Sequence, residues 1–181
     1  MQVMEVALIF KPLVIATGLF VLTGCVEDAV SGQSGGTGVP TAAPASASCK
    51  APAAVPANAA ALLQMINTER AKAGVAPLGL SQPASRVAQA YACQAAGRRD
   101  ISHTGSDGSN IGDRLARAGL SFSVVAENTS FGFVSPERTM AAWMASPGHR
   151  ANILDKDVTL VGIGQAEGSY PTWVVDFFHP G

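Results

Sequence analysis

The chain changes composition sharply near Asn58, and this change fixes where a folded core can form. Residues 26–58 are mostly Gly, Ala, Ser, Thr and Pro, with almost no large apolar side chain. Such a segment cannot bury enough surface to offset the entropy that ordering would cost. Most of the aromatic residues follow Phe122. We therefore predict a single folded domain over residues 59–181, preceded by a flexible linker over 25–58.

The first residues have the pattern of an export signal. An apolar run over 12–22 is shorter than the roughly 20 residues that a helix needs to cross a bilayer. It ends in Leu22-Thr23-Gly24-Cys25, which resembles the lipobox of bacterial lipoproteins. The resemblance implies removal of a signal peptide over 1–24 and a lipid on Cys25, which would anchor an extracytoplasmic protein to a membrane of the bacterial cell envelope. The alternatives are an ordinary cleaved signal and an uncleaved anchor.

The use of cysteine fits an oxidising compartment. Once Cys25 is assigned to the anchor, Cys49 and Cys93 remain as an even pair. Disulfides persist outside the reducing cytosol, so Cys49 and Cys93 could form one. The alternative leaves both as thiols, with that of Cys93 buried. Neither cysteine has neighbours that indicate a nucleophile or a metal ligand.

The charge pattern excludes one large class of partners. The formal net charge is -1 at pH 7, and Lys and Arg never form a run. We therefore expect neither a nucleic-acid surface nor a polybasic membrane patch. We also expect the domain to be a monomer.

Caps, prolines and hydrophobic spacing predict the order of the elements. Helices are predicted at 59–73 after an Asn58 cap, after Ser81, at 111–118, and from Ser135-Pro136-Glu137. Strands are predicted at 122–133, interrupted by the polar Glu127-Asn128-Thr129, and at 158–165 and 172–178. This order indicates an α+β fold with a small antiparallel sheet between helical layers.

Four short stretches, taken together in this order, are specific to one family. They are Ile66-Asn67-Thr68-Glu69-Arg70, Ser102-His103-Thr104-Gly105-Ser106-Asp107-Gly108, Ala126-Glu127-Asn128, and the segment from Trp143 to Leu154 that contains Ser146-Pro147-Gly148-His149. They resemble the bacterial branch of the CAP superfamily, which also contains cysteine-rich secretory proteins, insect venom antigens and plant pathogenesis-related proteins. The resemblance covers residues 59 to about 180 and implies a three-layer α-β-α sandwich.

The resemblance also implies a surface cleft with histidines and acids. His103 and His149 match the two cleft histidines, and Glu127 matches the glutamate of a Gly-Glu-Asn element in which Ala126 replaces the glycine. Ser146 stands where many eukaryotic members carry a second glutamate. That replacement removes one carboxylate and puts a four-residue catalytic scheme in doubt.

The chemistry of these three residues leaves several functions open. Two imidazoles from separate loops can ligate a divalent cation such as Zn²⁺ or Cu²⁺, with water in the remaining positions. Glu127 could orient one imidazole or act as a general base on a metal-bound water. The trio could therefore bind a metal with a small, lipid or peptide ligand, or be a structural hydrogen-bond network. It could also serve a hydrolase of envelope or extracellular substrates with Glu127 as the catalytic residue, although no His-Glu-x-x-His or Gly-x-Ser-x-Gly motif is present.

The remaining polar and aromatic residues near these motifs are predicted to be structural. Trp143 and Trp173 are expected in the core. Asn128, beside the cleft, and Asn152 are expected to satisfy buried backbone groups. Arg114 is expected on the surface.

Overall fold

The computed structural model describes Cys49 and residues 55–181. The predicted signal peptide, the predicted lipidation site Cys25 and the predicted linker on either side of Cys49, up to residue 54, lie outside these described residues. No helix within them is long and apolar enough to cross a membrane. In this part of the chain the elements follow in the order α1 (Val55–Lys72), β1 (Gly79–Leu80), α2 (Gln82–Arg98), α3 (Ile111–Arg117), β2 (Val124–Phe131), α4 (Pro136–Ala145), α5 (Pro147–Ile153), β3 (Leu160–Ala166) and β4 (Thr172–His179).

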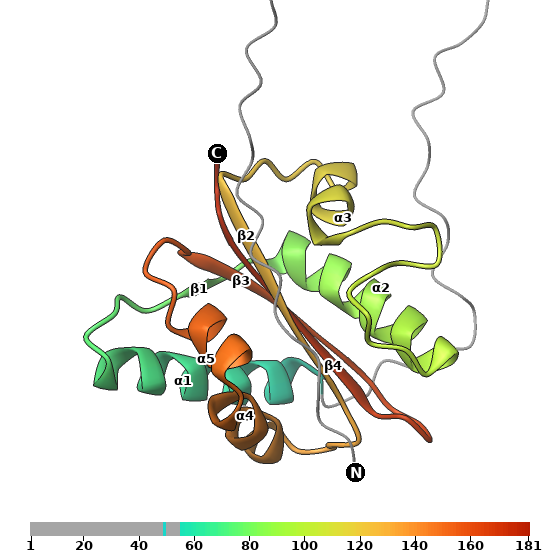
Figure 1. Ribbon diagram of the computed structural model, residues 1–181, viewed down its shortest axis with the longest axis horizontal. Coiled ribbons are helices and arrows are strands. Elements are labelled where there is room, and N and C mark those ends of the chain that lie inside the picture. Colours follow the sequence, from blue (N-terminus) through green and yellow to red (C-terminus); the bar gives the residue numbers. More distant parts are fainter. Residues whose placement is uncertain (1–48, 50–54) are drawn as a thin grey trace, which may run out of the picture. The chain divides into compact units, whose positions relative to one another are not determined.

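The sheet lies between two helical layers, as the sequence predicts. Its strand order is β1-β3-β4-β2, with β3, β4 and β2 antiparallel and the short β1 parallel to β3. Helices α2 and α3 cover one face, and α1, α4 and α5 cover the other (Figure 1). Strand β2 forms one edge of this sheet, and the candidate site lies along it.

Local capping explains where several helices begin. Ser81 and Ser135 accept hydrogen bonds from the first turns of α2 and α4, and each helix has proline near its start. The prediction that Asn58 caps α1 is wrong. The helix begins at Val55, and the Asn58 amide donates instead to Gln165 Oε1, 2.8 Å away.

Two further expectations from the sequence need correction. Strand β2 continues without a break through Glu127-Asn128-Thr129, because side chains alternate between the two faces and each of these three has polar contacts there. The segment after Ser146 is a further helix, α5, rather than only a break. Proline is tolerated in the first turn of a helix, so Pro147 ends α4 and begins α5.

Helix α2 lies unusually close to strand β3, and two glycines make this possible. A Cβ added at Gly162 would come 2.4 Å from the backbone carbon of Ala84. A Cβ at Gly164 would come equally close, 2.4 Å, to backbone atoms of Ala88 and Gln89. Only hydrogen at these two positions lets the helix backbone approach the strand.

Arg70, from the first of the four motifs, is buried and forms hydrogen bonds to several backbone segments. It is 1% exposed, and its guanidinium donates to the carbonyl oxygens of Ala76, Ile153, Asp155 and Val158. Burial lowers the pKa of Arg70, partly offset by the nearby charge of Asp155. The residue therefore ties the end of α1 to the segment between α5 and β3.

A disulfide joins Cys49 to Cys93 in the structure. Cys93 lies on α2, and both cysteines pack against the cluster that α2 forms with the sheet. Cys49 is thus bonded to the helical layer on the opposite face of the sheet from α1 (Figure 1).

Candidate functional site

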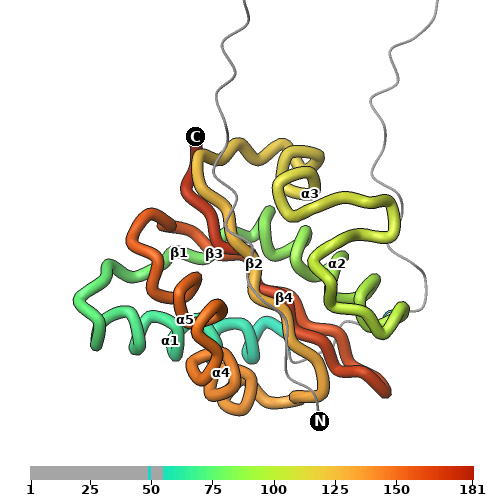
Figure 2. Tube along the Cα trace, in the orientation of Figure 1, coloured from blue at the N-terminus to red at the C-terminus, as the bar shows by residue number. Residues whose placement is uncertain are grey.

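The candidate site straddles the edge strand β2. In Figure 2 the loop between α2 and α3 lies on one side of β2, and α4 with α5 lies on the other. Side chains alternate along a strand, so Glu127 contacts Arg114 of α3 whereas Asn128 contacts the backbone of α5. The loop supplies His103, as expected, whereas His149, which was also expected on a loop, lies in helix α5.

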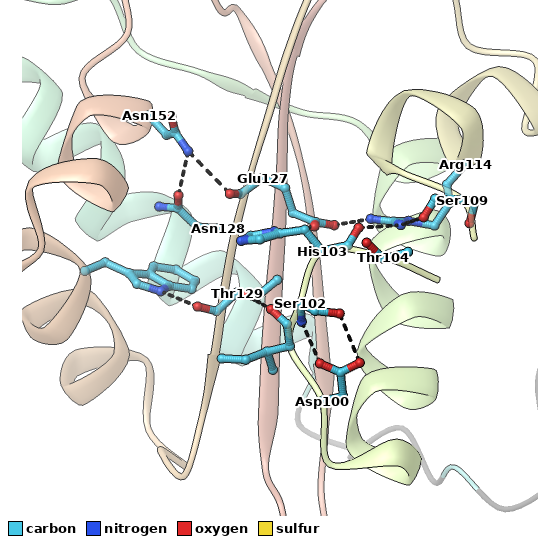
Figure 3. A network of polar contacts seen from close by, with 12 residues as sticks. Asp100, Ser102, His103, Thr104, Ser109, Arg114, Glu127, Asn128, Thr129 and Asn152 are labelled. Carbon is cyan, nitrogen blue, oxygen red and sulfur yellow. Dashed lines mark hydrogen bonds and ion pairs between the residues drawn. The ribbon is translucent and has the colours of Figure 1, made fainter. Parts of the chain in front are cut away.

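Glu127 is the centre of the polar network drawn in Figure 3. Its carboxylate is only 2% exposed, and both of its oxygens are engaged. Oε1 lies 2.7 Å from His103 Nδ1, and Oε2 pairs with Arg114 Nη2. Because an ionised carboxylate only accepts hydrogen bonds, this contact assigns a proton to His103 Nδ1, and in the neutral ring Nε2 is then the acceptor.

His103 has an unusual backbone as well as an oriented ring. Its φ is +67°, in the left-handed region that residues other than glycine seldom adopt. Its carbonyl oxygen accepts a hydrogen bond from Arg114 Nη1 at 3.2 Å. The buried Nε2 has no hydrogen-bond partner among the described residues.

His149 is the more deeply buried of the two histidines. It is 2% exposed, and neither ring nitrogen has a hydrogen-bond partner within the described chain. Burial lowers the pKa of His149 to about 4, and a proton on the neighbouring His103 ring would act in the same direction. Its imidazole is therefore neutral at physiological pH, which is the form that binds metals.

Two asparagines hold the segments on either side of β2 in place. The Asn128 amide donates to the carbonyl oxygen of His149 at 3.1 Å. The Asn152 amide donates to the carbonyl oxygen of Glu127 at 3.3 Å and to Asn128 Oδ1 at 2.9 Å. Both asparagines thus satisfy buried backbone groups, as expected from the sequence, and they join α5 to the strand that carries Glu127.

The structure adds residues that the sequence did not point to. Asp176 lies directly opposite Glu127 on β4 and is fully buried. Burial and the charge of Glu127 raise the pKa of the Asp176 carboxyl well above its usual range. Arg114 was expected on the surface, yet its side chain is only 10% exposed and lies over the Tyr91 ring, 3.8 Å from the ring centre.

The other predicted site residues lie at the margins of this network. Ser146 is half-buried at the junction of α4 and α5, where its side chain makes no capping hydrogen bond. Trp143 and Trp173 are fully buried core residues. Within the described residues, no group of three or more His, Cys, Asp and Glu side chains is arranged to hold a metal ion.

A separate hollow of about 350 Å³ lies between α1 and α4. Three methionines line it, with two glutamates among its other residues: Met65, Met140 and Met144, and Glu69 and Glu137. His103, Glu127 and His149 are not part of this lining. They were expected in an accessible surface cleft, but the side chains of His103 and Glu127 are only 12% and 2% exposed, and His149 is 2% exposed.

The three-layer fold agrees with a family comparison. Residues 63–177 match CAP, the cysteine-rich secretory protein family. The chain belongs to this family. The matched range contains His103, Glu127 and His149.

Individual relatives are similar over the same domain. The Bacillus subtilis protein YkwD is 30% identical over 152 residues, which is 83% of this chain and 59% of YkwD. The B. subtilis membrane protein YlbC is 29% identical over 103 residues, or 57% of this chain and 30% of YlbC. The chain therefore spans less than two thirds of either relative.

Solved structures share the CAP fold. An outer surface protein of Borrelia burgdorferi superposes with a TM-score of 0.65 at 24% identity, covering 69% of this chain and 94% of the Borrelia chain. An extracellular Bacillus anthracis protein with an SCP domain gives 0.62 at 22% identity, covering 66% of this chain and 39% of that protein.

Proposed function

We propose that this CAP domain is an extracytoplasmic binding module whose cleft holds a divalent metal ion, Zn²⁺ or Cu²⁺, on His103 and His149. One observation carries the proposal: His103 Nε2 and both ring nitrogens of His149 are buried without hydrogen-bond partners among the described residues. Buried polar nitrogens normally have partners, so an unpartnered pair of imidazoles suits a ligand. A bound ion would supply Lewis acidity, with positions left for water or a polar ligand group.

The contacts of Glu127 favour binding over hydrolysis. Both of its oxygens are engaged, one with His103 Nδ1 and one with Arg114. Such a carboxylate fits the role of an outer partner that fixes the ring of a metal-binding histidine. A general base would need an oxygen free to take a proton from water.

We also propose that the domain is displayed at the cell envelope through a lipid on Cys25. The lipobox-like Leu22-Thr23-Gly24-Cys25 supports this anchor, and the Cys49–Cys93 disulfide supports an oxidising compartment. The names of two similar solved proteins describe one as an outer surface protein and the other as extracellular.

The metal proposal predicts that removing either histidine abolishes tight binding. In titration calorimetry of the purified metal-free chain, we expect one site for Zn²⁺ or Cu²⁺. His103→Ala and His149→Ala should each weaken it by more than about 100-fold, beyond the loss typical of an outer partner. His179→Ala is the matched control, because this exposed histidine contacts Thr159 and not the cleft. If His103→Ala and His149→Ala bind the metal as tightly as His179→Ala and the parent protein, His103 and His149 do not form the site.

The methionine-lined hollow supports a second candidate function, the binding of an amphiphile. Methionine side chains adapt to flexible apolar ligands. The carboxylates of Glu69 and Glu137 in the lining would repel an anionic head group, so we propose an uncharged acyl-chain lipid as the ligand.

This candidate can be tested at Met144, which is half-buried in the hollow. Met144→Glu should weaken the binding of a fluorescent monoacylglycerol by about tenfold or more, because an ionised carboxylate is costly against an acyl chain. Met144→Leu keeps the volume and the apolar character, and it should bind like the parent protein. Absence of saturable binding to the parent protein would remove the candidate.

A further inference from the structure

Arg114 contacts His103 in two different ways. Its Nη1 donates to the carbonyl oxygen of His103 at 3.2 Å and to that of Ser109 at 3.0 Å. Its Nη2 pairs with Glu127, whose other oxygen accepts from the His103 ring. One guanidinium therefore holds the backbone of His103 directly and the ring of His103 through Glu127 (Figure 3).

The His103 backbone needs such an attachment. A left-handed conformation is unfavourable for a residue with a side chain, and His103 adopts it at φ +67°. The loop that carries His103 runs between α2 and α3, whereas Glu127 belongs to the sheet. Arg114, at 10% exposure, bonds to the loop and to the sheet at once.

Arg114 is itself fixed by the layer beneath it. Its guanidinium lies over the ring of Tyr91 from α2, with 3.8 Å between the guanidinium carbon and the ring centre. Stacking on an aromatic face and a planar fork of donors are properties of arginine that lysine lacks. Two of its acceptors are carbonyl oxygens of the loop, and the third is the Glu127 carboxylate on β2. A single lysine ammonium group could not replace the several donors of the guanidinium at these positions.

We propose that Arg114 is the positioning residue of the cleft: it directs Glu127 Oε1 to His103 Nδ1 and thereby presents an unprotonated His103 Nε2 to the ligand. This inference rests on the proposed metal-binding function for its purpose. The geometry that it concerns exists without a metal and can be measured without one.

The test is the tautomer of His103 in the metal-free full chain, read from ¹⁵N NMR of the imidazole. The parent protein should show a protonated Nδ1 and an unprotonated Nε2. In Arg114→Met, we expect a mixture of the two tautomers and a Zn²⁺ affinity that is about 10- to 100-fold weaker. Arg114→Lys retains the charge beside Glu127 but loses the fork, so both effects should be present and smaller.

Arg117→Met is the matched control. Arg117 lies on the same helix, is exposed, and pairs only with Asp107 among the described residues, so neither the tautomer nor the affinity should change. If the parent protein binds neither Zn²⁺ nor Cu²⁺, the metal-binding proposal fails, while the NMR comparison still decides the role of Arg114. An unchanged His103 spectrum in a folded Arg114→Met or Arg114→Lys variant would overturn the positioning role, whether or not metal binds.

Discussion

Replacing Gly164 with alanine is expected to lower the free energy of unfolding by about 3 kcal/mol, at the upper end of the range for overpacking. The added Cβ would come 2.4 Å from backbone atoms of α2. A flexible side chain could rotate away from such a contact, but the helix backbone can escape only if α2 moves off the sheet. Thermal unfolding followed by circular dichroism should show a melting temperature lower by about 10 °C.

Gly97→Ala is the control for this substitution. Gly97 lies near the end of the same helix, where an added Cβ would meet nothing within 4 Å. Alanine should therefore stabilise α2 at that position by about 0.5 to 1 kcal/mol. Opposite signs for the two substitutions would identify close packing as the cause, whereas similar losses at both positions would contradict it.

Acidification is expected to destabilise the fold through His149. The folded state lowers the pKa of His149 from 6.5 to about 4, so between these values the unfolded chain binds the proton more readily. The free energy of unfolding therefore falls as the pH drops below 6.5, where the unfolded chain begins to bind this proton and the folded protein does not. Each pH unit is worth about 1.4 kcal/mol, and the loss reaches about 3 kcal/mol near pH 4.

The His149 contribution can be isolated by comparing the protein with His149→Gln. Urea unfolding of both metal-free proteins at pH 7.5 and pH 4.5 gives two changes in the free energy of unfolding. We expect the parent protein to lose about 2 to 3 kcal/mol more than the variant. Other titrating groups, including Asp176, are present in both proteins and cancel in the comparison. Parallel losses would show that His149 does not cause the acid sensitivity.

Much of the fold could be predicted because local chemistry determines it. Ser81 and Ser135, each followed by proline, specify helix starts without help from distant residues. Asn58 carries the same kind of capping signal, but its amide contacts Gln165 in the sheet, and a partner so far along the chain has no local signature. The same reasoning explains α5: Pro147 can end one helix and begin another, and local sequence does not distinguish these roles.

In the candidate site, too, some residues could be predicted from the sequence and others could not. His103, Glu127 and His149 stand in motifs that resemble the CAP family, so they could be named from the sequence. Arg114 has ordinary helical neighbours, and its burial depends on Tyr91 and on β2 coming together in the folded chain. Asp176 sits within an apolar run over 172–178. An acid at that place in a buried strand is the signal that could have drawn attention to it.

The bond between Cys49 and Cys93 has a mechanical consequence. Any tension applied to the chain ahead of Cys49 passes through the disulfide into α2, which packs on β3 and β4. Helix α1 begins six residues later, at Val55, so it would bear none of that pull while the bond is intact. Reduction of the disulfide would transfer the force to the first turn of α1, and the domain would then begin to unfold at that helix.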